Sequence, residues 1–234
     1  MDNFEYVYEN YKDVFEQKEE AIKKYAPTNK DVTLIAVSKN FEIEKINVLV
    51  KKGVKDFGES KVQEFLPKYE YFKEFNINWH FIGRLQKNKV KYIVDKVAYI
   101  HSVDSMELAE VINKECTKKG VVVKIFLQVN VGEDGNKQGF SYNDFPKALE
   151  ILKNMKNIEV VGFMTILPIL DDANAVDNFY HKMYELLLDN SSFFIHNRHK
   201  ACLSMGMSDD YNIAIKNNAN FIRVGTAIFG NRYL

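Results

Sequence analysis

One lysine of the sequence stands where a nucleophilic amine could work. Lys39 follows Ser38 and the apolar run Thr33–Val37. A lysine that is partly removed from water loses its proton more readily, because burial disfavours the ammonium form, and the neutral amine can then add to an aldehyde. Position alone does not decide the matter, since a solvated lysine at the end of a strand is the simpler interpretation.

Two further segments contain the residues of an anion site. Ser204–Ser208 (SMGMS) precedes an apparent helix that begins near Asp209. Small residues there let backbone N–H groups and hydroxyls converge beside the amino end of a helix, which favours an anion. In Arg223–Thr226, Gly225 permits close approach of the backbone and Thr226 adds a hydroxyl donor. The two segments predict a phosphate site, although the first could instead serve only as a helix cap, and the carboxylates that follow it must point outward.

A repeated pattern of strands and helices must position these residues. Short apolar runs rich in strand-forming residues alternate with mostly helix-like stretches, and about eight such units result. Such units imply parallel pairing with right-handed crossovers, because a tight turn cannot reach a parallel neighbour. The expected strands are Thr33–Val37, Asp56–Gly58, Trp79–Ile82, Tyr99–Val103, Val121–Val129, Glu159–Met164, Ala201–Ser204 and Phe221–Val224.

The units favour a closed barrel over an open doubly wound sheet. They are numerous and similar, and no glycine-rich dinucleotide fingerprint follows the first strand. Apolar residues at helical spacing from Phe4 to Tyr25, ended by Pro27, predict an additional helix ahead of the first strand. We therefore predict an α/β fold, a single (β/α)8 TIM-type barrel with an extra N-terminal helix, as one domain over residues 1–234. Strand ends of such a barrel meet at one mouth, and phosphate commonly binds between strands seven and eight.

Composition argues against several classes of protein. Lys and Arg together number 32, as do Asp and Glu, so no broad field attracts nucleic acid or an anionic membrane. The basic run Lys87, Lys89 and Lys91 is interpreted as a solvated helix face. Cys116 and Cys202 are too few for a disulfide framework, and the charged first 20 residues do not fit a signal peptide. We expect a cytoplasmic protein with both thiols reduced.

One pair of imidazoles invites a test for a metal site. His196 and His199 are closely spaced, but we identify no set of thiol or carboxylate partners that would complete a site with them. Three or four ligands are the rule for zinc. We therefore predict no metal.

Segments spread over nearly the whole chain resemble the pyridoxal phosphate homeostasis protein family. Because they are many, the resemblance does not depend on one short motif. They are Leu34–Lys39, Phe57–Glu59, Trp79–Gly83, Leu85–Lys89, His101–Asp104, Gln128–Asn130, Leu203–Ser208 and Arg223–Gly230.

The resemblance implies a site for pyridoxal 5′-phosphate in an alanine-racemase-like barrel. Lys39 would carry the cofactor as a Schiff base, and Arg223 would face the pyridine nitrogen. A permanent cation there disfavours protonation of the ring, so the cofactor is a weaker electron sink than when it is paired with Asp. The segments implied to bind the phosphate contain Ser204, Gly206, Met207, Ser208, Gly225 and Thr226.

Three other positions bear on the ring. His80 and Met164, at the ends of the third and sixth expected strands, could line it, or could equally be core residues. Ser60 departs from the family, which usually carries Asn after Gly-Glu, so the contact of that amide is altered or lost here.

The family is understood to buffer or deliver pyridoxal phosphate and to keep vitamin B6 and amino-acid pools in balance, with no firmly established reaction. Apo enzymes that need the cofactor are the candidate recipients, and a monomer is expected. One alternative is a pyridoxal-phosphate enzyme that acts on a small amino acid. Two-base racemisation is disfavoured, since the chain lacks the second domain of the racemases. The other alternative is a cofactor-free Schiff-base lyase acting on a sugar phosphate.

Overall fold

Eight parallel strands close into a barrel, in which each strand pairs with the next along the chain and β8 pairs with β1. The computed structural model describes residues 4–25, 31–132, 138–142, 144–168, 170–196 and 201–231, with only the backbone at 195 and 196. The strands are β1 Thr33–Val37, β2 Asp56–Glu59, β3 Asn78–Phe81, β4 Tyr99–Val103, β5 Val123–Gln128, β6 Ile158–Met164, β7 Cys202–Ser204 and β8 Phe221–Val224. The predicted barrel is confirmed.

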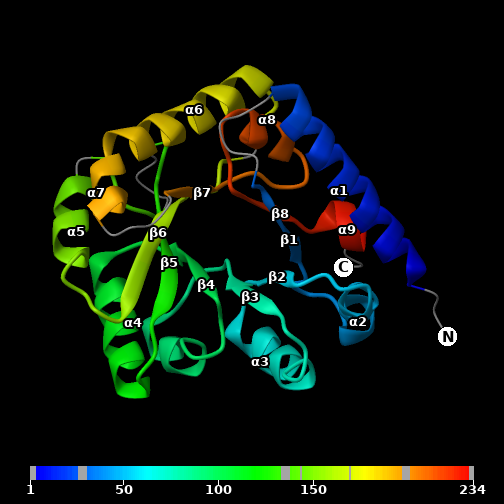
Figure 1. Cartoon of the computed structure of the whole chain (residues 1–234), viewed down its shortest axis with the longest axis horizontal. Helices are drawn as coiled ribbons and strands as arrows, with labels where there is room; N and C mark the ends of the chain where they lie inside the picture. Colours follow the sequence, from blue (N-terminus) through cyan, green and yellow to red (C-terminus); the bar gives the residue numbers. More distant parts are fainter. Residues whose placement is uncertain are drawn as a thin grey trace.

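Helices surround the barrel, because each parallel pair requires a crossover that returns the chain to the same edge (Figure 1). Amphipathic sequence supplies them, with one face of each helix directed at the strands. The helices are α1 Glu5–Tyr25, α2 Ile43–Lys51, α3 Val62–Tyr71, α4 Met106–Lys119, α5 Phe145–Leu152, α6 Ala173–Asp189, α7 Ser191–His196, α8 Tyr211–Lys216 and α9 Thr226–Phe229, and a 3-10 helix, η1, spans Lys87–Tyr92.

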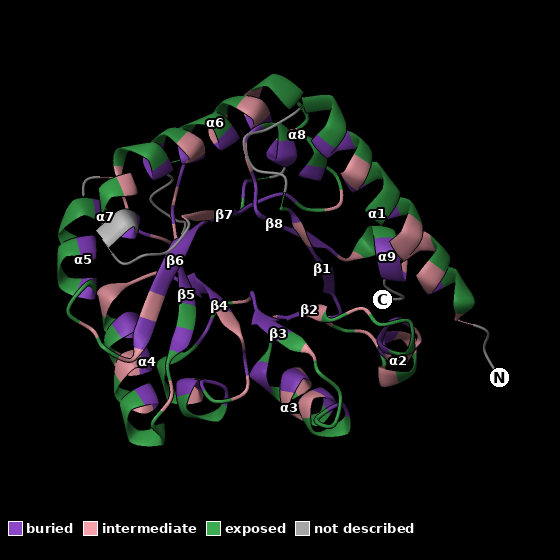
Figure 2. Ribbon diagram, viewed as in Figure 1, coloured by how far each residue is buried: buried purple, intermediate pink, exposed green. Residues whose placement is uncertain are grey.

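The core has two layers, one on each side of the strands. Figure 2 shows buried residues along the strands and on the inner faces of the helices. A large outer cluster lies between strands and helices. A smaller cluster fills the barrel and consists of Ile35, Val37, Ile82, Phe126, Val161, Met164 and Phe221. Side chains alternate across each strand, so β-strands of this barrel carry apolar residues on both faces.

The helix expected ahead of the first strand is α1, and it lies against the last elements of the chain (Figure 1). The Asn10 amide donates to the Ile228 carbonyl at 3.0 Å, and the Tyr211 hydroxyl donates to Gln17 Oε1 at 2.7 Å. Val7, Val14 and Ile22 are buried on the face that turns inward. The helix therefore covers the part of the barrel where the last strand meets the first.

Within the described residues, none of the helices combines the length and the apolar character that crossing a bilayer requires.

Candidate functional site

A pocket of about 410 Å³ opens among the loops that follow the carboxyl ends of the strands. Parallel strands bring these ends to one rim of the barrel, and for this reason residues far apart in sequence meet there. The lining contains the predicted site residues Lys39, Met207, Ser208, Arg223, Gly225 and Thr226. We call this cavity the mouth pocket.

The turn that carries Lys39 is held on both sides. The Ser38 carbonyl accepts from Lys68 Nζ at 2.8 Å, and the Ser38 hydroxyl donates to Glu59 Oε1 at 2.7 Å. On the other side, the backbone N–H of Asn40, in the left-handed region at φ 63°, donates to Glu64 Oε2 at 2.7 Å. Side chains from β2 and α3 therefore fix the direction in which the half-buried Lys39 leaves the barrel.

Glu59 and Lys68 form a buried ion pair behind that turn. Lys68 Nζ donates to Glu59 Oε1 at 2.7 Å, and the two side chains are 7% and 1% exposed for Lys68 and Glu59. Among the residues that the structure describes, the other carboxylate oxygen, Oε2, is buried and has no hydrogen-bond partner. Burial raises the pKa of Glu59, and the nearby ammonium of Lys68 opposes that rise. Neither residue was predicted from the sequence to belong to the site.

The loops after β7 and β8 face each other across the pocket. The backbone N–H of Ala227, in the first turn of α9, points to Ser208 Oγ at 3.4 Å. Gly206 adopts φ +94°, and a Cβ there would lie 2.7 Å from the Ala214 Cβ, so the close approach of α8 requires glycine. Hydroxyl and N–H groups thus converge where the sequence predicted an anion.

The two aspartates after Ser208 behave differently. Asp210 Oδ1 accepts from the backbone N–H of Met207 at 2.6 Å, and its Oδ2 accepts from the Tyr180 hydroxyl at 2.8 Å. Its carboxylate therefore caps the loop. Asp209 is exposed and belongs to the lining of the mouth pocket, so its charge lies at the edge of the predicted anion site.

Arg223 extends from the barrel interior to the mouth pocket. It is 4% exposed, and its guanidinium donates to Ser204 Oγ at 2.8 Å and to the Thr165 carbonyl at 2.9 Å. Burial lowers the pKa of Arg223, while Tyr180 and Asp210 act in the opposite direction. An arginine keeps its proton at any ordinary pH, so the pocket has a fixed cation in its floor.

Four predicted site residues are not among those that line the mouth pocket. Ser204 and Gly206 lie beneath it, and both support its walls through Arg223: the backbone N–H of Arg223 donates to the Gly206 carbonyl at 2.9 Å. Met164 is fully buried in the cluster inside the barrel. His80 is also buried there, where it contacts His101 and Asp56.

The lining includes residues that sequence analysis did not assign to the site. Arg84 and Gln138 both line it, and the side-chain oxygen of Gln138, oriented to accept, lies 2.6 Å from Arg84 Nε. Ser60 lines it as well, at the position where the family carries Asn. A Cβ on Gly83 would lie 2.2 Å from the Ser60 carbonyl oxygen, so these two backbones touch. Arg84 directly follows the segment Trp79–Gly83, which is the one sequence signal for it, and no such signal marks Gln138.

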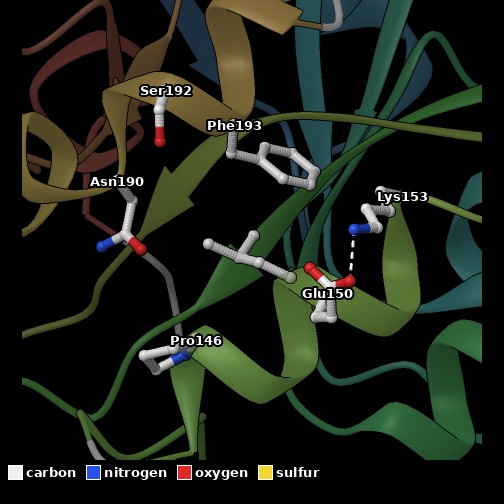
Figure 3. A pocket seen from close by; sticks show the side chains of 7 residues that line it. Pro146, Glu150, Lys153, Asn190, Ser192 and Phe193 are labelled. Atoms are coloured by element: carbon white, nitrogen blue, oxygen red, sulfur yellow. Dashed lines mark hydrogen bonds and ion pairs between the residues drawn. The ribbon is translucent and has the colours of Figure 1, made fainter.

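A second cavity, of about 380 Å³, lies outside the barrel between α5 and α7 (Figure 3). Its wall combines Pro146 and Phe193 with the polar side chains of Asn190 and Ser192, and Lys153 and Glu150 form an ion pair at its edge. None of the predicted site residues lines it, so we place the candidate site at the barrel mouth.

The remaining sequence candidates lie elsewhere. Lys87, Lys89 and Lys91 belong to η1, a 3-10 helix. Cys116 is buried, which raises its pKa to about 11. Across the described ranges no three His, Cys, Asp or Glu side chains group as metal ligands. His199 and the side chain of His196 fall outside the described residues.

The fold and this site define a class. The family model described as alanine racemase, N-terminal domain, matches residues 13–233, so the chain belongs to that class of barrels. The pyridoxal phosphate homeostasis protein of Aquifex aeolicus (strain VF5) is 40% identical over 199 residues, which are 85% of this chain and 86% of the relative. The chain is a member of the pyridoxal phosphate homeostasis protein family, and the predicted resemblance is confirmed.

A solved structure of similar sequence agrees with this assignment. PipY of Synechococcus elongatus PCC7942, with PLP bound, has a TM-score of 0.78 and 30% identity to this chain, and the match covers 91% of this chain and 100% of PipY. The same protein without PLP has a TM-score of 0.80 and 31% identity, over 91% of this chain and 99% of PipY.

Proposed function

We propose that this chain binds pyridoxal 5′-phosphate in the mouth pocket and holds it as a Schiff base on Lys39. One observation carries the proposal: an amine, a fixed cation and a set of hydroxyl and N–H donors line a single cavity of about 410 Å³. That volume suits a small ligand. The bound group supplies an aldehyde and an electron-withdrawing ring, and the chain supplies the groups that hold them.

Each part of the ligand has a matching part of the pocket. Lys39 is the amine for the aldehyde. Ser208, Thr226 and the N–H of Ala227 offer donors to the phosphate. Arg223 places a permanent cation at the ring, which disfavours a proton on the ring nitrogen, and weak assistance to carbanions suits storage more than turnover.

The biological role that follows is vitamin B6 homeostasis. The chain acts as a buffer or carrier of pyridoxal phosphate, with effects on amino-acid balance, and apo enzymes that require the cofactor are its recipients. We propose a cytoplasmic monomer with no nucleic-acid or membrane partner, occupying residues 1–234 as one domain. The balance of 32 basic and 32 acidic residues is in keeping with the lack of a polyanionic partner.

Absorbance spectroscopy of the purified chain mixed with pyridoxal phosphate tests the proposal. We expect a visible band that borohydride removes, followed by a mass increase on the peptide that contains Lys39. Lys39→Ala should abolish the band, whereas Lys91→Ala, which changes an exposed lysine beside Tyr92, should leave it intact. A label on another lysine, or a band that persists in Lys39→Ala, contradicts the proposal.

The same samples separate the alternative functions. If an amino acid is consumed while the band changes and returns, the chain is an enzyme. If no band forms and a sugar phosphate is cleaved, the chain is a lyase. Buffering predicts reversible binding, and transfer of the cofactor to an apo enzyme, without net change of either substrate.

A further inference from the structure

A continuous line of hydrogen bonds crosses the inside of the barrel below the mouth pocket. Arg223 Nη1 lies 2.8 Å from Ser204 Oγ, and Ser204 Oγ lies 2.8 Å from His101 Nδ1. His101 Nε2 lies 2.9 Å from His80 Nδ1, and His80 Nε2 lies 3.1 Å from Asp56 Oδ1. The line begins in β8, passes through β7, β4 and β3, and ends at the first residue of β2. It therefore joins the mouth to the opposite rim of the barrel.

The chemistry of the two ends sets the direction of every proton. A guanidinium can only donate and a carboxylate can only accept. With both imidazoles neutral, one arrangement satisfies all four contacts: Ser204 accepts from Arg223 and donates to His101, His101 donates from Nε2 to His80, and His80 donates from Nε2 to Asp56. The reverse arrangement would place a lone pair of His80 against the carboxylate.

The middle of this line is buried, and its far end is partly exposed to solvent. His80 stacks on Tyr99 with ring centroids 4.9 Å apart and an interplanar angle of 5°, and His101 stacks on Phe126 at 4.4 Å and 17°. The side chain of His80 is fully buried, whereas that of Asp56 is 28% exposed. Burial lowers the pKa of both histidines, which agrees with the neutral forms.

We propose that Asp56, His80, His101 and Ser204 are positioning residues that orient the Arg223 guanidinium from the far end of the barrel, and so set how tightly the pocket holds a ligand with an aromatic ring nitrogen. The ligand class rests on the proposed function. Ser204 and the Thr165 carbonyl fix the two terminal nitrogens of Arg223. Loss of His101 or of the groups behind it leaves the Ser204 hydroxyl less firmly oriented, so the contact at Nη1 weakens and the cation keeps its charge but is held less well in its direction.

The proton arrangement is tested by nitrogen NMR of the histidine rings in the chain without added cofactor. We expect His80 and His101 to be neutral at neutral pH, with the proton on Nε2. A proton on Nδ1 of His101, or a charged ring at neutral pH, overturns the arrangement. This measurement does not depend on Lys39 or on any bound ligand.

The positioning role is tested by binding of two probes, pyridoxal phosphate and inorganic phosphate. We expect His101→Leu and Asp56→Ala to weaken pyridoxal phosphate about 2- to 30-fold and to leave inorganic phosphate unchanged, because only the first probe has a ring nitrogen. His101→Asn, whose amide can still accept from Ser204, should recover part of the loss. Asp95→Ala, which removes a partly buried carboxylate that pairs with Lys96 and Lys119, is the matched control.

Two outcomes would overturn this role. If the variants weaken the binding of both probes equally, they distort the whole pocket. If the affinity for neither probe changes, the hydrogen-bonded line does not orient Arg223. If the unaltered chain fails to bind pyridoxal phosphate, the proposed function fails and so does the ligand class named here, while the NMR result still decides the proton arrangement.

Discussion

At the scale of single residues, the most informative feature is the buried pair behind the Lys39 turn. A buried ion pair stabilises a fold only when its geometry is good and its remaining atoms are hydrogen-bonded. Glu59 Oε1 meets that condition through Lys68 and Ser38, but Oε2 does not. The pair is therefore better explained by what it holds, which is the backbone of Ser38 next to Lys39, than by a contribution to stability.

The raised pKa of Glu59 predicts a pH dependence of stability. The folded chain keeps this proton to a higher pH than the unfolded chain, so the stability that the site contributes is complete below the unfolded pKa and is lost as pH rises through the folded one. Glutamine has no such proton. The free energy of unfolding of Glu59→Gln, minus that of the unaltered chain, should therefore increase with pH over that window, by about 1.4 kcal/mol for each unit between the two pKa values.

Urea unfolding at a series of pH values measures this difference. Glu70→Gln, at an exposed glutamate that pairs with Lys73, is the control and should show no such trend. A difference for Glu59→Gln that is flat, or that falls as pH rises, would show that Lys68 and Ser38 outweigh burial at this carboxylate.

Residue types and strand ends were enough to predict some of the site but not its supports. Lys39, Ser208, Arg223 and Thr226 could be placed because each lies at or shortly after the end of a predicted strand. The contact of Glu59 with Lys68 could not be predicted from the sequence, because it depends on how α3 lies against β2. For the same reason His80 could be placed on its strand, while its partner His101 depends on the register between β3 and β4.

At the scale of elements, the sequence predicts the bounds of some strands better than the type of some helices. The bounds predicted for β1, β4 and β8 are those observed. The basic run at Lys87–Lys91 lies in a 3-10 helix, whose tighter turn depends on its packing rather than on periodicity. The turn at Gly206 is an intermediate case: sequence marks it as flexible, but only the structure shows α8 against it.

Gly206→Ala should therefore disturb the loop between β7 and α8. A Cβ there meets Ala214 Cβ at 2.7 Å and Tyr211 Cα at 2.9 Å, in a backbone with φ +94°. We expect a loss of about 1–3 kcal/mol in unfolding free energy, together with weaker binding of pyridoxal phosphate, because α8 must move away from Ser208.

Gly120→Ala is the matched control for that change. Gly120 also has a positive φ, +67°, but nothing lies within 4 Å of its Cβ position, and it ends α4. We expect a cost of about 1 kcal/mol and unchanged binding. Chemical unfolding and a ligand titration of both variants give the comparison; equal effects on binding would show that the contact with α8 does not shape the pocket.

At the scale of the whole molecule, the barrel is not equally strong around its circumference. β5 and β6 are paired over the whole length of β5, whereas β7 and β8 share only the pair of Ser204 with Phe221. We call the junction of β7 and β8 the seam. Two backbone hydrogen bonds from the adjoining loops complete it: the N–H of Met205 donates to the Phe221 carbonyl at 3.1 Å, and the N–H of Asn220 donates to the Leu203 carbonyl at 2.8 Å. Both loops of the predicted phosphate site leave from this seam.

Hydrogen exchange should reveal that seam as the part of the barrel that opens first. Local opening occurs where few backbone bonds and contacts resist it, so the amides of Met205, Asn220 and Arg223 should exchange faster than that of Leu127 in β5.

A ligand that bridges the loops after β7 and β8 must be released before the seam opens. Saturation at 100 times Kd should therefore slow the seam amides by about 100-fold, which corresponds to about 2.7 kcal/mol. Pyridoxal phosphate should have this effect in the unaltered chain, and inorganic phosphate at the same multiple of its own Kd should have it in Lys39→Ala. If the seam amides already exchange as slowly as that of Leu127, the barrel opens only as a whole. If they do not respond to either ligand, the phosphate does not join the last two strands.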